Sequence, residues 1–208
     1  MAKSAMKVLL VVVFCGSTFG LDIVSSGYSV QTYTTYSESG IGGISDMTFD
    51  DEGNLYATHR FDDSIWRTTP AGTASEFVSG FGVRGIDWGG GTTYGNYLYA
   101  PDAGVPNGEI RRIDKSGTIS TFATFGSPKH GLDLAAIDRT GNYGGLLYTA
   151  TKSIDHTYSV DTSGNISMFS DFPGQKNGGG PREIAFDTTG NFGSLMYIST
   201  SFNNISQC

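Results

Sequence analysis

The sequence predicts an all-β protein made of repeated four-stranded antiparallel sheets, and three observations support this prediction. The chain of 208 residues holds 30 glycines, 13 phenylalanines and 11 tyrosines, while charged residues make up only 16%. No segment of 11 or more residues carries apolar side chains at the i, i+3, i+4, i+7 spacing of an amphipathic helix. A short turn sequence that begins with aspartate and has glycine at its fourth position occurs five times.

Each of these D-x-x-G turns predicts a β-hairpin. An aspartate at the first position accepts backbone N–H bonds from residues further along the turn, and glycine at the fourth adopts positive φ without steric cost. A calcium-binding loop would need acidic residues at alternating positions over a longer segment, and the turn DTTGN has one. The turns begin at Asp50, Asp114, Asp138, Asp161 and Asp187.

The strands around these turns form a unit of four strands that repeats along the chain. Tyrosines occupy equivalent positions in the units at 56, 99, 148 and 197, separated by 43, 49 and 49 residues. A repeat of about 40–50 residues with four short strands is typical of a β-propeller blade. The expected units cover 44–79, 84–124 and 132–171, and a fourth begins with two strands at 182–187 and 195–200.

The ends of the repeat predict how the ring is organised. The segment 28–39 has the pattern of a fourth strand, so we expect it to complete the last sheet of the ring. We therefore expect a partial β-propeller domain over 28–208, with about three complete blades plus part of a fourth. The complete ring of six or seven blades would need roughly 270–320 residues. The chain alone would expose an open sheet face, and we expect it to aggregate or fold poorly.

The N-terminal residues have the order of a secretory signal peptide. Two lysines precede the apolar run VLLVVVF and small residues follow it, which predicts a signal peptide over 1–20 with cleavage after Gly20. Bulky Phe14 disfavours lipid attachment at Cys15, and the basic start disfavours a buried strand. The run is too short to span a bilayer, and no later stretch approaches that length. We expect a protein that is secreted, periplasmic or held at the cell surface, without a transmembrane segment.

The charge of the chain excludes some classes of partner. Loss of Lys3 and Lys7 with the signal peptide would leave 11 basic and 20 acidic residues, a net charge of −9. An acidic protein is a poor binder of nucleic acid or of an anionic membrane. Cys208 would be the one cysteine left after cleavage, so we expect no internal disulfide.

Several phrases resemble a known superfamily. FDDEGNLYAT, YLYAPDAGVPNGEIRRIDKSGTISTFA and PREIAFDTTGN are similar to the six-bladed β-propellers that include NHL-repeat proteins, streptogramin lyases and gluconolactonase/regucalcin-like enzymes. The resemblance covers roughly residues 28–205 and lies in the turns and strand faces that build blades. It therefore implies the fold, and it does not choose among the activities that this fold supports.

The resemblance also allows a test for a metal site. Gluconolactonase/regucalcin-like enzymes hold a divalent metal with carboxylate and amide oxygens at the starts of strands. The corresponding positions here are Ser45, Arg84 and Arg182. Arginine stays charged and cannot bind a hard cation, so we expect no metal and no other cofactor. A divalent metal remains the alternative if other blades supply the ligands.

The resemblance implies a ligand site at one mouth of the central channel, near the starts of the innermost strands and the loops after the second strands. His130 is a weak catalytic candidate, as an acid or base like that of the lyases. No nucleophile or second histidine stands in a fixed relation to it. Asp46 and Glu183 either pair with the arginines or leave them to attract an anion. The predicted ligand-binding residues are Asp46, Arg84, His130, Asp133, Arg182 and Glu183.

These observations predict a binding or scaffold module without a catalytic motif. Its partner at the channel mouth would be a small anionic ligand, a glycan or another protein. A gluconolactonase- or lyase-like enzyme of the same superfamily is the alternative. The phenylalanines and tyrosines in the strands are expected to pack one blade against the next rather than to bind sugar.

Overall fold

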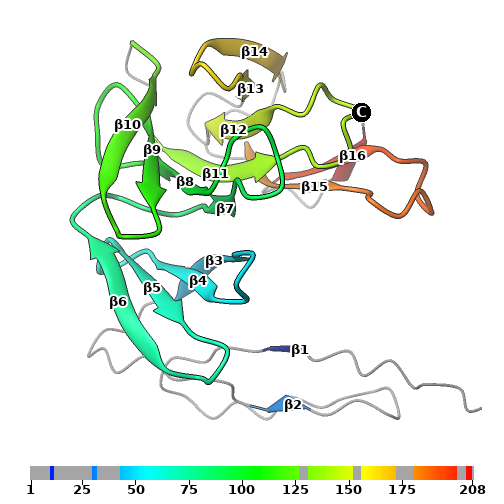
Figure 1. Ribbon diagram of the computed structural model, residues 1–208. Coiled ribbons are helices and arrows are strands. Elements are labelled where there is room, and N and C mark those ends of the chain that lie inside the picture. The colour runs from blue at the N-terminus through cyan, green and yellow to red at the C-terminus, as the bar shows by residue number, and fades with distance from the viewer. Residues whose placement is uncertain are drawn as a thin grey trace, which may run out of the picture.

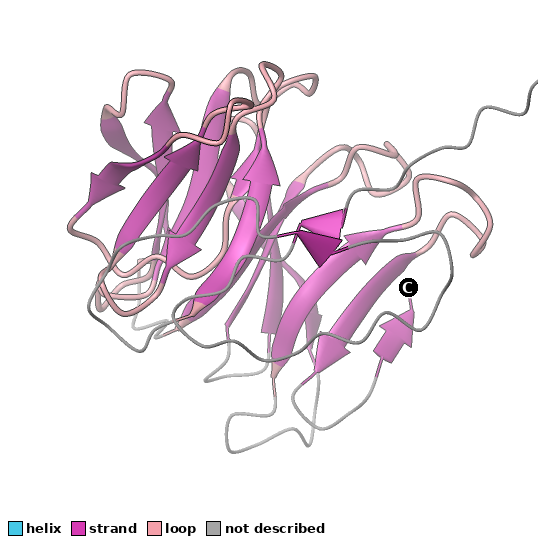
Figure 2. Cartoon of the chain, turned by 90° about the horizontal axis from the view of Figure 1, so that it is seen from below, coloured by secondary structure: helices cyan, strands magenta, loops and turns pink. Residues whose placement is uncertain are grey.

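The fold is described from a computed structural model of the chain. Its strands form separate antiparallel sheets that lie side by side, so that each sheet faces the next (Figures 1 and 2). Within the described residues there is no helix, and hence none that could cross a bilayer. The structure describes residues 43–126, 131–151, 156–171 and 180–200 with their side chains, and 10–11, 30–31 and 205–207 by backbone alone.

Three of the sheets have four strands each, and neighbours in the sequence are neighbours in the sheet, as the repeat predicted. The first strands of consecutive sheets contact one another, so these strands lie innermost. The first sheet contains β3 (Ile44–Phe49), β4 (Leu55–His59), β5 (Ser64–Thr68) and β6 (Ala74–Ser79); the second, β7 (Asp87–Trp88), β8 (Tyr97–Asp102), β9 (Glu109–Asp114) and β10 (Ile119–Thr124); the third, β11 (Leu132–Ile137), β12 (Leu147–Thr151), β13 (His156–Val160) and β14 (Ile166–Asp171).

The last sheet has three described strands rather than the two expected. It contains β15 (Pro181–Phe186), β16 (Met196–Thr200) and β17 (Ile205–Gln207). A further pair, β1 (Leu10–Val11) and β2 (Val30–Gln31), runs parallel. The backbone partner of β2 is β1. That segment 28–39 completes the last sheet of the ring stays a prediction, and the rest of this segment lies outside the described residues.

The D-x-x-G turns have the structure that the sequence predicted. In the turn of the last sheet, the Asp187 carboxylate accepts N–H bonds of 2.8–3.0 Å from Thr189, Gly190, Phe192 and Ser194. The Thr189 hydroxyl donates a further bond, and together these bonds hold the pKa of Asp187 well below its ordinary value. The glycine of every turn has positive φ, as the type of turn requires: Gly53, Gly117, Gly141, Gly164 and Gly190.

An aromatic pair within each complete sheet fills the space beside the next sheet. A tyrosine of the second strand meets a phenylalanine of the fourth strand in a T-shaped contact, the geometry that aromatic rings prefer. The phenylalanine is in each case the extra residue of a β-bulge between the third and fourth strands. The ring centroids are 5.1 Å apart for Tyr56 and Phe77, 4.9 Å for Tyr99 and Phe122, and 5.0 Å for Tyr148 and Phe169.

Candidate functional site

A β-bulge interrupts the innermost strand of the first sheet. Ile44 pairs with His59, but Asp46 pairs with Thr58, so that Ser45 is an extra residue without a partner across the ladder. A bulge of this kind bends the strand and changes the direction of the side chains around the extra residue. Two consecutive residues near the strand start can then face the centre of the sheets, which a regular strand does not allow.

The bulge recurs at the same place in the other sheets. The extra residue is Asp133 in the third sheet and Arg182 in the last. In the second sheet, Val83 bridges to Asp102, whereas Asp87 of β7 pairs with Tyr99 of β8. The register therefore shifts by one residue between Val83 and Asp87, the segment that contains Arg84. Ser45, Arg84 and Arg182, the positions that correspond to metal ligands in the gluconolactonase/regucalcin-like pattern, therefore lie at these bulges.

The extra residues of the four sheets and three neighbours line one pocket of about 130 Å³, here called the channel pocket. Five of the six residues predicted to bind a ligand lie in it, and they come from all four of these sheets. His130 lies outside the described residues. The lining residues are Ser45, Asp46, Arg60, Arg84, Asp133, Arg182 and Glu183.

Two arginines converge on one carboxylate in this pocket. Arg84 Nη1 donates to Asp133 Oδ1 at 3.4 Å, and Arg182 Nη1 lies 3.6 Å from Asp133 Oδ2. The Asp133 side chain is 9% exposed, and each arginine side chain is 39% exposed. From the sequence, Asp46 and Glu183 were possible partners of these arginines; in the ion pairs that the structure describes the partner is Asp133. The reason is geometric, because all three are bulge residues at the same level of neighbouring sheets.

Asp46 has a different role, in which it joins the first sheet to the second. Its Oδ2 accepts the Ile86 N–H at 2.8 Å, and its Oδ1 accepts the N–H of the adjacent Met47 at 2.7 Å. Burial raises the pKa of Asp46 to about 7 against the opposing effect of the Ile86 bond, and the nearby Glu183 adds to the rise. Asp46 therefore holds one wall of the channel pocket in place and resists ionisation there.

Glu183 completes the acidic side of the pocket. Its Oε1 accepts the N–H of Ile184 at 3.2 Å, and its side chain is exposed. Surrounding protein atoms still displace part of its hydration shell, which raises the pKa of Glu183 above its ordinary value. The pocket holds three arginines, which stay charged, and three carboxyl groups. Because the pKa values of Asp46 and Glu183 are raised, the local charge of the pocket becomes positive as the pH falls.

The sequence did not indicate how the sheets are fastened around this pocket. Asp87 accepts the Ile137 N–H at 2.7 Å and pairs with Arg139 at 2.9 Å, which links the second sheet to the third. Gly85 is buried so closely against the third sheet that no larger residue fits. In the sequence, the only sign of this close contact between sheets is that a glycine, Gly85, follows Arg84. In the described part of the chain, no group of three or more metal-ligating side chains is arranged to hold a metal.

Comparison with known proteins gives matches by structure. No protein-family model matches the chain, and no curated protein matches its sequence. Virginiamycin B lyase from Staphylococcus aureus, solved with quinupristin, has a TM-score of 0.60 and 19% identity over 88% of this chain and 57% of its own. A streptogramin B lyase gives 0.56 and 20% over 84% and 56%. A protein assigned as a gluconolactonase gives 0.63 and 15% over 88% and 65%.

The chain thus spans 56–65% of the length of these structures. The TM-scores of 0.56–0.63 support a common fold, while identities of 15–20% leave the activity open. The repeated four-stranded antiparallel sheets agree with the same architecture. The protein therefore has the β-propeller fold that streptogramin lyases and gluconolactonase-type proteins share.

Proposed function

We propose that the protein is a binding module that holds a small anionic group in the channel pocket. The observation that carries this proposal is the convergence of Arg84 and Arg182 on Asp133 from three different sheets. Planar guanidinium groups suit the two oxygens of a carboxylate or sulfate. Contacts of 3.4 and 3.6 Å to Asp133 are longer than the 2.7–2.9 Å of a close charge-assisted bond, so an incoming anion competes with a loosely held partner.

The size and charge of the pocket limit the ligand. A volume of about 130 Å³ is well below the ~300–1,000 Å³ of pockets that enclose drug-sized molecules. The pocket therefore suits one charged group, such as the carboxylate of a uronic acid or of an acidic peptide, with the rest of the ligand outside. The raised pKa values of Asp46 and Glu183 keep repulsion of that group low below neutral pH.

The test is calorimetric titration of the protein with acetate, succinate, sulfate and glucuronate at pH 6. We expect at least one anion to bind, and the double variant Arg84→Ala, Arg182→Ala to weaken that binding at least tenfold. The matched control is Arg67→Ala, Lys115→Ala, which removes the same charge at sites outside the pocket. Unchanged binding by the pocket variant to every anion that the wild type binds would refute the proposal.

We further propose that the protein is exported and acts outside the cytoplasm, which the basic, apolar and small-residue order of residues 1–20 supports. N-terminal sequencing of the protein from its native host tests this. A mature chain that begins at Leu21 is expected, and one that retains Met1 or Ala2 in the extracytoplasmic fraction would contradict cleavage.

An enzyme remains the second candidate because the structural matches include lyases and a gluconolactonase-type protein. In that case we propose His130 as the acid or base. Incubation with quinupristin and with gluconolactone, followed by mass spectrometry, tests the activity that the neighbours' names suggest. Turnover by the wild type that His130→Ala abolishes would favour the enzyme; binding without turnover favours the module.

A further inference from the structure

A third arginine lines the channel pocket beside Arg84 and Arg182. Arg60 lies in the loop 60–63 between β4 and β5 of the first sheet, whereas the other two lie at the strand starts of the second and last sheets. Three guanidinium groups therefore reach one pocket of about 130 Å³ from three different sheets. Such an arrangement can present N–H donors to a single anion from several directions.

The loop that carries Arg60 is held in place by contacts that do not involve its guanidinium group. His59 at the end of β4 is 1% exposed, and its Nδ1 lies 2.8 Å from Asp62 Oδ2. The carbonyl of Asp63 accepts the N–H of Gly80 at 3.0 Å. The Asp62 carboxylate is thus engaged by His59, and the loop places Arg60 at the pocket without using its charge.

The Arg60 side chain is exposed and available to a ligand. Its guanidinium carbon lies over the Phe61 ring, 4.8 Å from the ring centre. A guanidinium group over an aromatic ring still donates hydrogen bonds from its edge, because all of its N–H groups lie in its plane. Among the residues that the structure describes, Arg84 and Arg182 share the Asp133 carboxylate, and no carboxylate pairs with Arg60. A bound anion can therefore use Arg60 without breaking an ion pair that the structure describes.

We propose that the channel pocket selects a phosphate monoester and that Arg60 recognises its second negative charge. This inference rests on the proposed function, because it specifies which anion the same pocket holds. A phosphate monoester carries close to two negative charges near neutral pH and has three terminal oxygens. Each of the three guanidinium groups can thus donate to the phosphate, whereas a carboxylate has two oxygens and a single charge.

The charges of the pocket fit a dianion better than a monoanion. The three arginines and the Asp133 carboxylate together carry two positive charges when the other two carboxyl groups are protonated. The raised pKa values of Asp46 and Glu183 favour that state below neutral pH. A dianion then balances the charge of the pocket, while a monoanion leaves one positive charge in excess.

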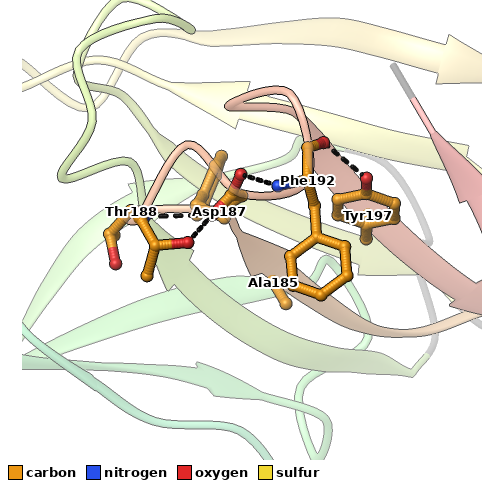
Figure 3. A pocket seen from close by; sticks show the side chains of 7 residues that line it. Ala185, Asp187, Thr188, Phe192 and Tyr197 are labelled. Atoms are coloured by element: carbon orange, nitrogen blue, oxygen red, sulfur yellow. Dashed lines mark hydrogen bonds between the residues drawn. The ribbon is translucent and has the colours of Figure 1, made fainter.

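The larger hollow beside the last sheet is a poor site for the same ligand. It has a volume of about 440 Å³, and its walls are Ala185, Phe192, Tyr197 and the Asp187 turn, without an arginine or lysine (Figure 3). Phe192 takes the place that Tyr143 has in the third sheet, because in both sheets the second-strand tyrosine donates its hydroxyl to the carbonyl of that residue. Tyr143 packs against the last sheet, so this hollow corresponds to a surface that packs sheets together.

Calorimetric titration with methyl phosphate and methyl sulfate at pH 6.5 and equal ionic strength tests the inference. The two probes have the same shape, but the phosphate ester is mostly a dianion at this pH and the sulfate ester is a monoanion. The wild type is expected to bind methyl phosphate about tenfold more tightly, as one additional charge-assisted hydrogen bond would give. Arg60→Ala should abolish this preference by weakening the binding of methyl phosphate alone, and Arg60→Lys, which keeps the charge, should retain part of it. The matched control is Arg67→Ala, which removes one positive charge outside the pocket and should bind both probes like the wild type.

The outcomes separate this inference from the proposed function. Equal binding of the two probes, with both weakened by the double variant Arg84→Ala, Arg182→Ala, would overturn phosphate selection and leave the anion pocket intact. Loss of the preference in Arg67→Ala as well as in Arg60→Ala would show a general effect of net charge and would also overturn the inference. Binding of neither probe would overturn it too, and the proposed function falls with it only if acetate, succinate, sulfate and glucuronate also fail to bind.

Two further measurements define the site and the ligand. Phe192→Ala should bind methyl phosphate like the wild type, and a weaker affinity would place the site in the hollow beside the last sheet instead. Methyl phosphate should bind at least as tightly as inorganic phosphate. Inorganic phosphate that binds while methyl phosphate does not would rule out an ester as the ligand.

Discussion

Arg84 and Asp133 form an ion pair of 3.4 Å between the second and third sheets, and the same carboxylate lies 3.6 Å from Arg182 of the last sheet. One carboxylate thus lies between two guanidinium groups and reduces the repulsion between them. Asp133 therefore contributes both to the stability of the packed sheets and to the charge of the channel pocket. Removing its charge tests both contributions.

Asp133→Asn should destabilise the protein by about 1 kcal/mol at low ionic strength, a modest value because both arginines are well exposed. Added sulfate should reverse most of the loss, since an anion between the arginines takes the place of the missing carboxylate. Thermal melts with and without sulfate measure both effects. Asp171→Asn, at an exposed acid paired with His156, is the control and should show no sulfate dependence beyond that of the wild type. Equal melting shifts in the two variants would contradict the prediction.

Asp46 predicts a pH dependence of stability. Burial raises its pKa from 3.8 to about 7 in the folded protein, so folding favours the protonated form. The resulting stabilisation is complete below pH 4 and is lost as the pH rises through about 7, with a magnitude on the order of 2–4 kcal/mol. Urea unfolding at pH 5 and pH 8 should show higher stability at pH 5.

The matched variant Asp46→Asn isolates this contribution, because it removes the titrating group and keeps one carbonyl oxygen as an acceptor. Its stability difference between pH 5 and pH 8 should be smaller than that of the wild type by the amount stated. Glu183 is present in both proteins, so the part of its titration that does not depend on Asp46 cancels in the comparison. Identical pH profiles would show that Asp46 is not held in its protonated form.

Gly85 sets the distance between the second and third sheets. A Cβ atom at this position would lie 2.5 Å from Leu134 Cα and 2.7 Å from the Asp133 carbonyl oxygen, both backbone atoms. Gly85→Ala should therefore cost about 1–3 kcal/mol and weaken anion binding, because it forces apart the strands that carry Arg84 and Asp133. Gly43→Ala, where a Cβ would meet nothing within 4 Å, is the control. Chemical denaturation measures the first effect and calorimetry the second; wild-type values for both would contradict the close contact.

Tyr143 gives a direct measure of the interface between the third and last sheets. Tyr143→Phe removes the acceptor of the Met196 N–H and leaves a buried donor without its partner, which should cost about 1–3 kcal/mol. The reverse change at the equivalent position, Phe192→Tyr, should leave the stability of the isolated chain unchanged because that ring is exposed. Hydrogen exchange at Met196 should accelerate in Tyr143→Phe alone. Equal effects of the two changes would show that the interface bond contributes nothing.

The sequence was sufficient to predict the sheets and to locate the pocket, for physical reasons that particular residues illustrate. Turns such as that of Asp187 are local, because the carboxylate and the N–H groups it binds lie within seven residues. The spacing of Tyr99 and Tyr148 fixes the repeat because each must fill the same space beside the next sheet. The strand starts around Arg84 and Arg182 were identified as candidates by their position in that repeat.

The partners within the pocket could not be predicted from the sequence. A bulge at Ser45 or Asp133 changes which residues face the centre, and it depends on a one-residue shift in pairing that no local residue pattern demands. Without that shift, pairing of Arg84 with Asp46 was as reasonable as pairing with Asp133. The pairing of β2 with β1 also depends on the encounter of two distant segments rather than on the strand pattern of either one.

The recurring bulge has a consequence for how this protein could change its specificity. Each extra residue contributes one side chain to the centre, while the ladder and the aromatic packing are made by its neighbours. Substitutions at these few sites can therefore alter what is recognised while the surrounding framework keeps its shape, so that relatives with nearly identical frameworks need not share a target.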